Sequence, residues 1–131
     1  MELHLKITGI LLIILALIHI AFPKYFNWEK EFRPLSLMNR QMMRVHTIFI
    51  ALIIFLMGLL CLTSFNELTE PGLGKKIILG LGVFWTTRLI IQFFGYSSEL
   101  WKGKTFETII HIIFSLLWIY ISSLFWIIYF S

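Results

Sequence analysis

Apolar residues occur in four long runs along the chain, separated by short polar stretches. The runs cover residues 7–22, 45–65, 77–96 and 108–130. A bilayer core about 30 Å thick needs roughly 20 helical residues to cross it. The last three runs have this length, and the first has it if its helix begins near Glu2. The pattern predicts four membrane-spanning helices, with approximate spans 5–22, 43–65, 77–96 and 107–130.

Short connections make consecutive helices antiparallel neighbours. We therefore expect an all-α fold in which residues 1–131 form a single transmembrane domain, an up-and-down four-helix bundle. Between the first two helices, aromatic residues alternate with charges, which is typical of an interfacial segment lying among lipid headgroups: Tyr25, Phe26, Trp28 and Phe32.

Local signals predict where these elements begin and end. Pro23 is expected to end the first helix, and Pro34 to interrupt the interfacial segment. Ser36 is a candidate N-cap, so the second helix should start near Leu37. The stretch 66–74 has the composition of a tight turn.

Composition agrees with a membrane protein. Of the residues, 59% are hydrophobic and 14% charged, whereas soluble domains average about 45–50% and about 25%. The net charge of +4 could indicate a nucleic-acid partner. Because the basic residues mostly flank the apolar runs, we expect them to orient the protein in a bilayer and expect no nucleic-acid binding. The single Cys61 excludes an intrachain disulfide.

Basic residues are unequally divided between the two sides of the membrane. One side carries seven, namely Lys24, Lys30, Arg33, Arg40, Arg44, Lys102 and Lys104. The other carries three, namely Lys6, Lys75 and Lys76. Short cytoplasmic loops are enriched in Lys and Arg. Both termini are therefore expected on the non-cytoplasmic side.

Polar residues within the helices share one depth. His19, His46, Gln92, Arg88 and His111 lie within roughly 5–12 Å of the cytoplasmic ends of their helices. Polar side chains in lipid-embedded helices turn inward, because lipid offers them no partner. We therefore expect a ligand-binding pocket inside the bundle, formed by Arg88, Gln92, His46, His111 and Trp85.

Helical spacing places these residues on shared faces. In the third helix, a spacing of three or four residues aligns Trp85, Arg88, Gln92 and Tyr96. In the fourth, it aligns Thr108, His111, Ser115, Trp118 and Ser122. The glycines Gly80 and Gly82 favour a close contact between helices.

Arg88 has two interpretations. An arginine at the centre of a spanning helix costs about 2.5–3.5 kcal/mol, which is a reason to expect a function for it. Its planar fork suits a phosphate or carboxylate. The alternative is structural: the side chain reaches cytoplasmic phosphates, loop carbonyls, or a carboxylate of Glu31, Glu99 or Glu107.

The histidines offer another alternative. His19, His46 and His111 lie on three helices, where two could bind the iron of haem b and three could bind zinc or copper. Their spacing matches no metal motif, and a single histidine is more often a structural hydrogen-bonding residue. No carboxylate is paired with a nucleophile, so we expect no catalytic residue.

Two stretches carry a family resemblance. “RVHTIFIALIIFLMGLL” and “FWTTRLIIQFF”, which contain His46, Trp85, Arg88 and Gln92, resemble small four-span bacterial inner-membrane proteins. The resemblance covers most of the chain. It implies a four-span architecture in the bacterial inner membrane, and it implies no reaction, ligand or partner.

The expected function is a binding protein or accessory subunit for a lipid, a quinone or another amphiphilic anion. Membrane lipids, a larger membrane protein complex and a second copy of the chain are its expected partners. The alternatives are a redox protein that uses His19, His46 and His111, and a structural subunit of a larger complex.

Overall fold

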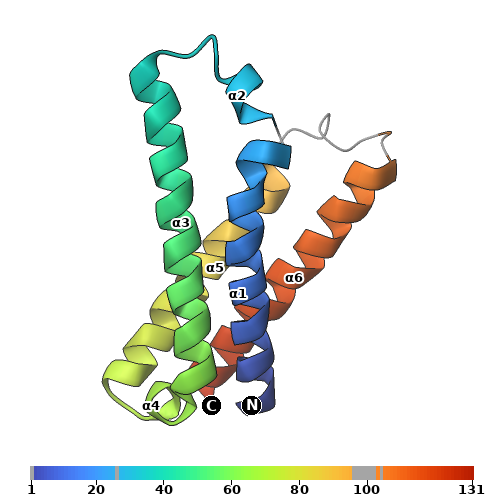
Figure 1. Cartoon of the computed structure of the whole chain (residues 1–131). Helices are drawn as coiled ribbons and strands as arrows, with labels where there is room; N and C mark the ends of the chain where they lie inside the picture. The colour runs from blue at the N-terminus through green and yellow to red at the C-terminus, as the bar shows by residue number, and fades with distance from the viewer. Residues whose placement is uncertain (1, 26, 96–102, 104) are drawn as a thin grey trace. The chain divides into compact units, whose positions relative to one another are not determined.

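The computed structural model describes residues 2–25, 27–95, 103 and 105–131, and every regular element among them is a helix. In chain order these are α1 Glu2–Tyr25, α2 Trp28–Glu31, α3 Leu37–Thr63, α4 Phe65–Thr69, α5 Leu73–Phe94 and α6 Thr105–Phe130 (Figure 1). Helices α1, α3, α5 and α6 are 22 to 27 residues long and apolar enough to cross a membrane. This confirms the prediction of an all-α fold with four helices long and apolar enough to span a membrane.

In the N-terminal half, the structure confirms the predicted start of α3 and corrects the predicted end of α1. The Ser36 side chain accepts a hydrogen bond from the backbone N–H of Asn39 at 3.2 Å, and α3 begins at Leu37 as predicted. The prediction that Pro23 ends the first helix is wrong, because α1 continues to Tyr25. A proline in the last turn removes only one intrahelical donor and leaves the preceding turns intact.

The connection between α3 and α5 contains α4, a short helix that its turn composition did not predict. The chain reverses after α4 at Gly72, whose φ of 98° lies in the region that favours glycine. Gly74 lies so close to the carbonyl group of Glu67 that a side chain there would collide with it. The turn therefore needs glycine at both positions.

The described chain divides into two compact units, residues 1–65 and 66–131. In the first unit α1 packs along α3, and α2 contacts α1. In the second unit α5 packs along α6. Each unit is thus built on one pair of membrane-length helices. The arrangement of all four as one bundle, the single domain and the interfacial position of the segment around α2 stay predictions.

Both helix pairs cross at a glycine of their first helix. A Cβ at Gly9 of α1 would lie 2.7 Å from the carbonyl oxygen of Gly58 on α3. A Cβ at Gly82 of α5 would lie 3.3 Å from the ring of Trp126 and 3.6 Å from Cβ of Phe125 on α6. Gly82 confirms the expected close helix contact, whereas Gly80 has nothing within 4 Å of its Cβ position.

Candidate functional site

The polar residues of the second unit meet at the side chain of Gln92, which is 6% exposed. Arg88, one turn earlier on α5, donates from Nη1 to Gln92 Oε1 at 3.2 Å. Trp118 of α6 donates from Nε1 to the same oxygen at 3.3 Å. Gln92 Nε2 lies 3.1 Å from Nδ1 of His111, also on α6. A single amide therefore links the two helices. We call Arg88, Gln92, His111 and Trp118 the Gln92 cluster.

The neighbours determine which way this amide points. Guanidinium and indole nitrogens can only donate, so the atom between Arg88 and Trp118 has to be the carbonyl oxygen of Gln92. The amide nitrogen then faces His111 and donates to Nδ1. Since Nδ1 accepts, the proton of this imidazole lies on Nε2.

Arg88 lies against an aromatic wall. Its Cζ is 5.0 Å from the ring centroid of Trp118. Trp118 stacks on Trp85, with ring centroids 5.2 Å apart and an interplanar angle of 16°. A cation–π contact contributes about 0.5–2 kcal/mol, which offsets part of the cost of about 2.5–3.5 kcal/mol for an arginine in a spanning helix. The half-buried Arg88 is therefore supported on two sides, by Gln92 and by Trp118.

Two buried polar groups lie at the same helix interface as the Gln92 cluster. Trp85 Nε1 and Ser122 Oγ have no hydrogen-bond partner among the described residues. Trp85 is 1% exposed and Ser122 is 4% exposed, and a buried group left unsatisfied costs about 1–3 kcal/mol. The N–H of Trp85 and the hydroxyl of Ser122 are therefore hydrogen-bond donors without an acceptor among the described residues where α5 packs on α6.

Two further polar contacts join α5 and α6. Trp126 Nε1 donates to Thr86 Oγ1 at 2.7 Å. Lys75 Nζ lies 5.2 Å from the centroid of the Tyr129 ring. These contacts fix the antiparallel register of α5 and α6, and that register is what brings His111 and Trp118 opposite Gln92.

Of the predicted pocket residues, the second unit brings Arg88, Gln92 and His111 into one network, with Trp85 stacked beside it. His46 belongs to the first unit, where it is exposed on α3. Its expected place in the same pocket stays a prediction. The expectations for Phe26, Tyr96, Glu99, Lys102 and Lys104 lie outside the described residues.

The histidines differ in what they could offer a metal. Nδ1 of His19 donates to the carbonyl oxygen of Leu15 at 2.8 Å, the pattern by which metal-bound histidines orient Nε2 toward the ion. His111 has the opposite pattern, with Nδ1 occupied and the proton on Nε2. Among the described residues, no group of three or more His, Cys, Asp or Glu side chains could hold a metal ion.

Trp118 is the site residue that sequence reasoning missed. Its position seven residues after His111 places it on the polar face of the fourth helix, but the pocket expected from the sequence does not include it. Its indole is both a donor to Gln92 and the surface on which Arg88 lies. A tryptophan on the same face as buried polar residues was the signal for this role.

No protein-family profile, curated protein or solved structure matches this chain. Its function is therefore inferred from its residues and their geometry.

Proposed function

We propose that this chain is an integral membrane binding protein or accessory subunit that holds an amphiphilic anion, a quinone or a lipid headgroup at the Gln92 cluster. The observation that supports this most strongly is the guanidinium of Arg88, held by Gln92 Oε1 at 3.2 Å and by the face of Trp118 at 5.0 Å. A charge positioned in this way on a spanning helix is suited to a phosphate, a carboxylate or a polarised carbonyl.

The depth of Arg88 favours an amphiphile over a small soluble anion. Arg88 precedes Phe94, the last residue of α5, by six positions, or about 9 Å along the helix axis. A ligand that reaches it has its headgroup near the membrane surface and its apolar part in the hydrocarbon. Both helices expose large apolar side chains around the cluster, including Ile91, Phe93 and Ile112, which suit an acyl or isoprenoid chain.

Support from neighbouring residues makes the cluster suitable for binding. The buried Gln92 and Trp118 restrict the side chain of Arg88 before any ligand arrives, which lowers the entropic cost of binding. The unused N–H of Trp85 and hydroxyl of Ser122 offer further donors at the same interface. We infer that they become hydrogen-bonded when helix packing loosens around a headgroup.

The test is the set of amphiphiles that copurify with the protein in mild detergent, measured by mass spectrometry. Arg88→Gln should lower the bound anionic amphiphile about ten- to hundredfold, since a hydrogen bond to a charged group contributes about 1.5–3 kcal/mol. Lys75→Gln is the matched control, because it removes a cation that lies on an aromatic ring at the other end of the same helix pair. Equal retention by both variants would refute the proposal.

A redox function is the second candidate, and the hydrogen bond from His19 to Leu15 is the observation that favours it. Bound haem b would give a Soret band that shifts on reduction. Loss of the band in His19→Ala and its retention in His4→Ala would support this candidate. A colourless protein without stoichiometric zinc or copper would exclude it for the purified state.

A further inference from the structure

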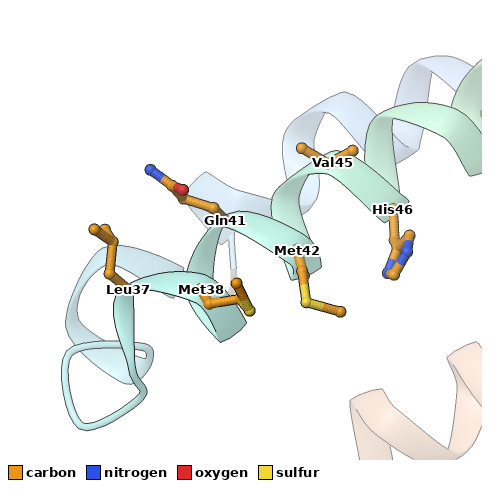
Figure 2. Close-up of a pocket in the computed structure, with 6 residues that line it drawn as sticks. All are labelled: Leu37, Met38, Gln41, Met42, Val45 and His46. Atoms are coloured by element: carbon orange, nitrogen blue, oxygen red, sulfur yellow. The ribbon is translucent and has the colours of Figure 1, made fainter.

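The first turns of α3 carry a hollow of about 400 Å³ on the first unit. All six lining residues belong to this helix: Leu37, Met38, Gln41, Met42, Val45 and His46 (Figure 2). They form two rows with a spacing of four residues, one through Gln41 and the other through Met42. The four apolar members, Leu37, Met38, Met42 and Val45, are each 46% to 70% exposed.

The length of α3 places this hollow at the membrane surface. The helix has 27 residues, or about 40 Å at 1.5 Å per residue, against about 30 Å of hydrocarbon. Its apolar stretch 45–63 alone covers about 28 Å. When this stretch spans the core, residues 37–44 extend into the headgroup layer, together with the exposed side chains of Leu37, Met38 and Met42.

Two arginines border the hollow. Arg44 follows Gln41 by three positions and Leu37 by seven, so it lies beside their row on the helix surface. Arg40 lies one turn before Arg44 on the same side. Among the described residues neither arginine takes part in an ion pair. The surrounding sequence is basic as well, with five Lys or Arg against two Glu between positions 24 and 46.

We propose that this surface, Arg40 and Arg44 together with the six lining residues of the hollow, binds an anionic phospholipid. The two guanidinium groups hold the phosphate, and the glycerol and first methylene groups lie against the hollow. Charge complementarity selects an anionic over a zwitterionic headgroup. The flexible side chains of Met38 and Met42 adapt to the irregular shape of a lipid.

This lipid surface is separate from the Gln92 cluster and does not depend on the function proposed for it. It lies on the first unit, whereas Arg88, Gln92, His111 and Trp118 all belong to the second. Lipid binding at the two sites can be tested separately, because Arg88→Gln removes the charge of the Gln92 cluster and leaves Arg40 and Arg44 in place.

The experiment compares lipid retention by the full-length protein in bilayer nanodiscs that contain equal amounts of phosphatidylglycerol and phosphatidylcholine with the same acyl chains. Native mass spectrometry counts the lipids that stay bound. We expect a preference for phosphatidylglycerol in the wild-type protein. Arg40→Gln/Arg44→Gln should reduce this preference by about fivefold for each arginine removed. Lys75→Gln/Lys76→Gln removes the same charge from the start of α5 and should leave the preference unchanged.

A third variant tests the apolar part of the surface. Met42→Glu keeps both arginines, introduces a negative charge into the hollow, and should lower phosphatidylglycerol retention. Size-exclusion chromatography and circular dichroism confirm that each variant is folded before it is compared. An equal loss of preference in both double variants would overturn the proposal, since any basic residue would then suffice. Displacement of the lipid by inorganic phosphate would also overturn it, since a small anion would then be the occupant.

Discussion

Two histidines, each six residues from one end of its helix, hold their protons on different nitrogens. His19 donates from Nδ1 to the carbonyl oxygen of Leu15, because a carbonyl can only accept. His111 accepts at Nδ1 from Gln92, because Arg88 and Trp118 occupy the amide oxygen. The difference follows from hydrogen bonding alone and requires no bound ligand.

We therefore predict opposite nitrogen signatures for the two side chains. In imidazole 15N NMR spectra of the protein in detergent micelles at neutral pH, Nδ1 of His19 should be protonated and Nδ1 of His111 should not. Gln92→Leu should change the His111 signals and leave those of His19 as they are. A protonated Nδ1 on His111 in the wild-type protein would contradict the hydrogen-bond pattern of the Gln92 cluster.

Two substitutions at Gln92 should differ in stability, because only one of them keeps a hydrogen-bond acceptor at this position. Gln92→Leu removes the acceptor of the buried Trp118 N–H, and we expect a loss of about 1–3 kcal/mol in the free energy of unfolding. Gln92→Glu keeps an acceptor for both Arg88 and Trp118, so its loss should be smaller. Unfolding by titration with denaturing detergent, followed by tryptophan fluorescence, measures the free energy of unfolding of both variants and of the wild-type protein.

Thr87→Val is the control for these substitutions. Thr87 is exposed on the same helix, and its hydroxyl donates to the carbonyl oxygen of Val83 within that helix. Its loss should change stability little. If Gln92→Leu were no less stable than Thr87→Val, the hydrogen bonds of Gln92 would not contribute to holding α5 against α6.

The sequence placed Arg88 and Gln92 on one face of α5 and did not predict how the residues of the second unit pair. A spacing of four residues is sufficient to align Arg88 with Gln92, and the cost of a polar group in lipid is sufficient to turn both inward. The choice of His111 and Trp118 as partners depends on the register between two helices. That register is set by packing around Gly82 and Trp126, and no single helix encodes it.

At the scale of elements, the two helix pairs bury side chains in the same register. Positions four before, one before and three after the crossing glycine are buried in both first helices: Leu5, Thr8 and Leu12 around Gly9, and Ile78, Leu81 and Trp85 around Gly82. In the second helices, buried residues follow a spacing of four and then three: Ile54, Gly58 and Cys61, and Ile121, Phe125 and Ile128. These are the spacings of three and four residues with which any helix packs one face against a neighbour.

The helix crossing is tighter in the first unit, where Gly9 meets Gly58. Gly9→Ala would place its Cβ 2.7 Å from the carbonyl oxygen of Gly58, a backbone atom. We expect this substitution to lower the free energy of unfolding by about 1–3 kcal/mol, the cost of overpacking a close contact. Tryptophan fluorescence during unfolding in detergent provides the measurement.

Gly80→Ala is the matched control, because it is the same substitution within a spanning helix. Gly80 is exposed, and nothing lies within 4 Å of its Cβ position. Alanine should leave stability unchanged or raise it by up to about 1 kcal/mol through its higher helix propensity. If both substitutions had the same effect, helix propensity rather than the α1–α3 crossing would explain the result.

Element boundaries show where sequence reasoning succeeds and where it does not. Ser36 could be identified as an N-cap, because serine is a preferred N-cap residue and Ser36 comes after a proline and directly before a helical pattern. The end of α1 was missed, because a proline tolerated in a last turn has the same sequence pattern as a proline that stops a helix. Helix α4 was missed, because five residues are too few to show a periodicity.

At the scale of the whole molecule, most large apolar side chains of the four spanning helices remain exposed. In a bilayer these surfaces meet lipid, and in an assembly some of them would meet a partner protein or a second copy. A structural subunit would copurify with a partner in fixed stoichiometry. A binding protein that acts alone would run as a single species and retain its amphiphile.

If all four apolar helices cross the membrane, both ends of the described chain lie on one side, and the distribution of basic residues predicts which side. Seven Lys or Arg are expected on one side and three on the other, so residues 2 and 131 should lie outside the cytoplasm. Single cysteines test this in a Cys61→Ala background, which removes the only native thiol. In intact cells, a membrane-impermeant maleimide should label Glu2→Cys and Ser131→Cys and should label Lys30→Cys only after lysis.

Each pattern of labelling has its own physical meaning. Labelling of Lys30→Cys alone would invert the orientation and leave the four spans intact, because both ends would still share one side. Labelling of only one end would contradict the four spans themselves, because an even number of crossings returns the chain to the side from which it started.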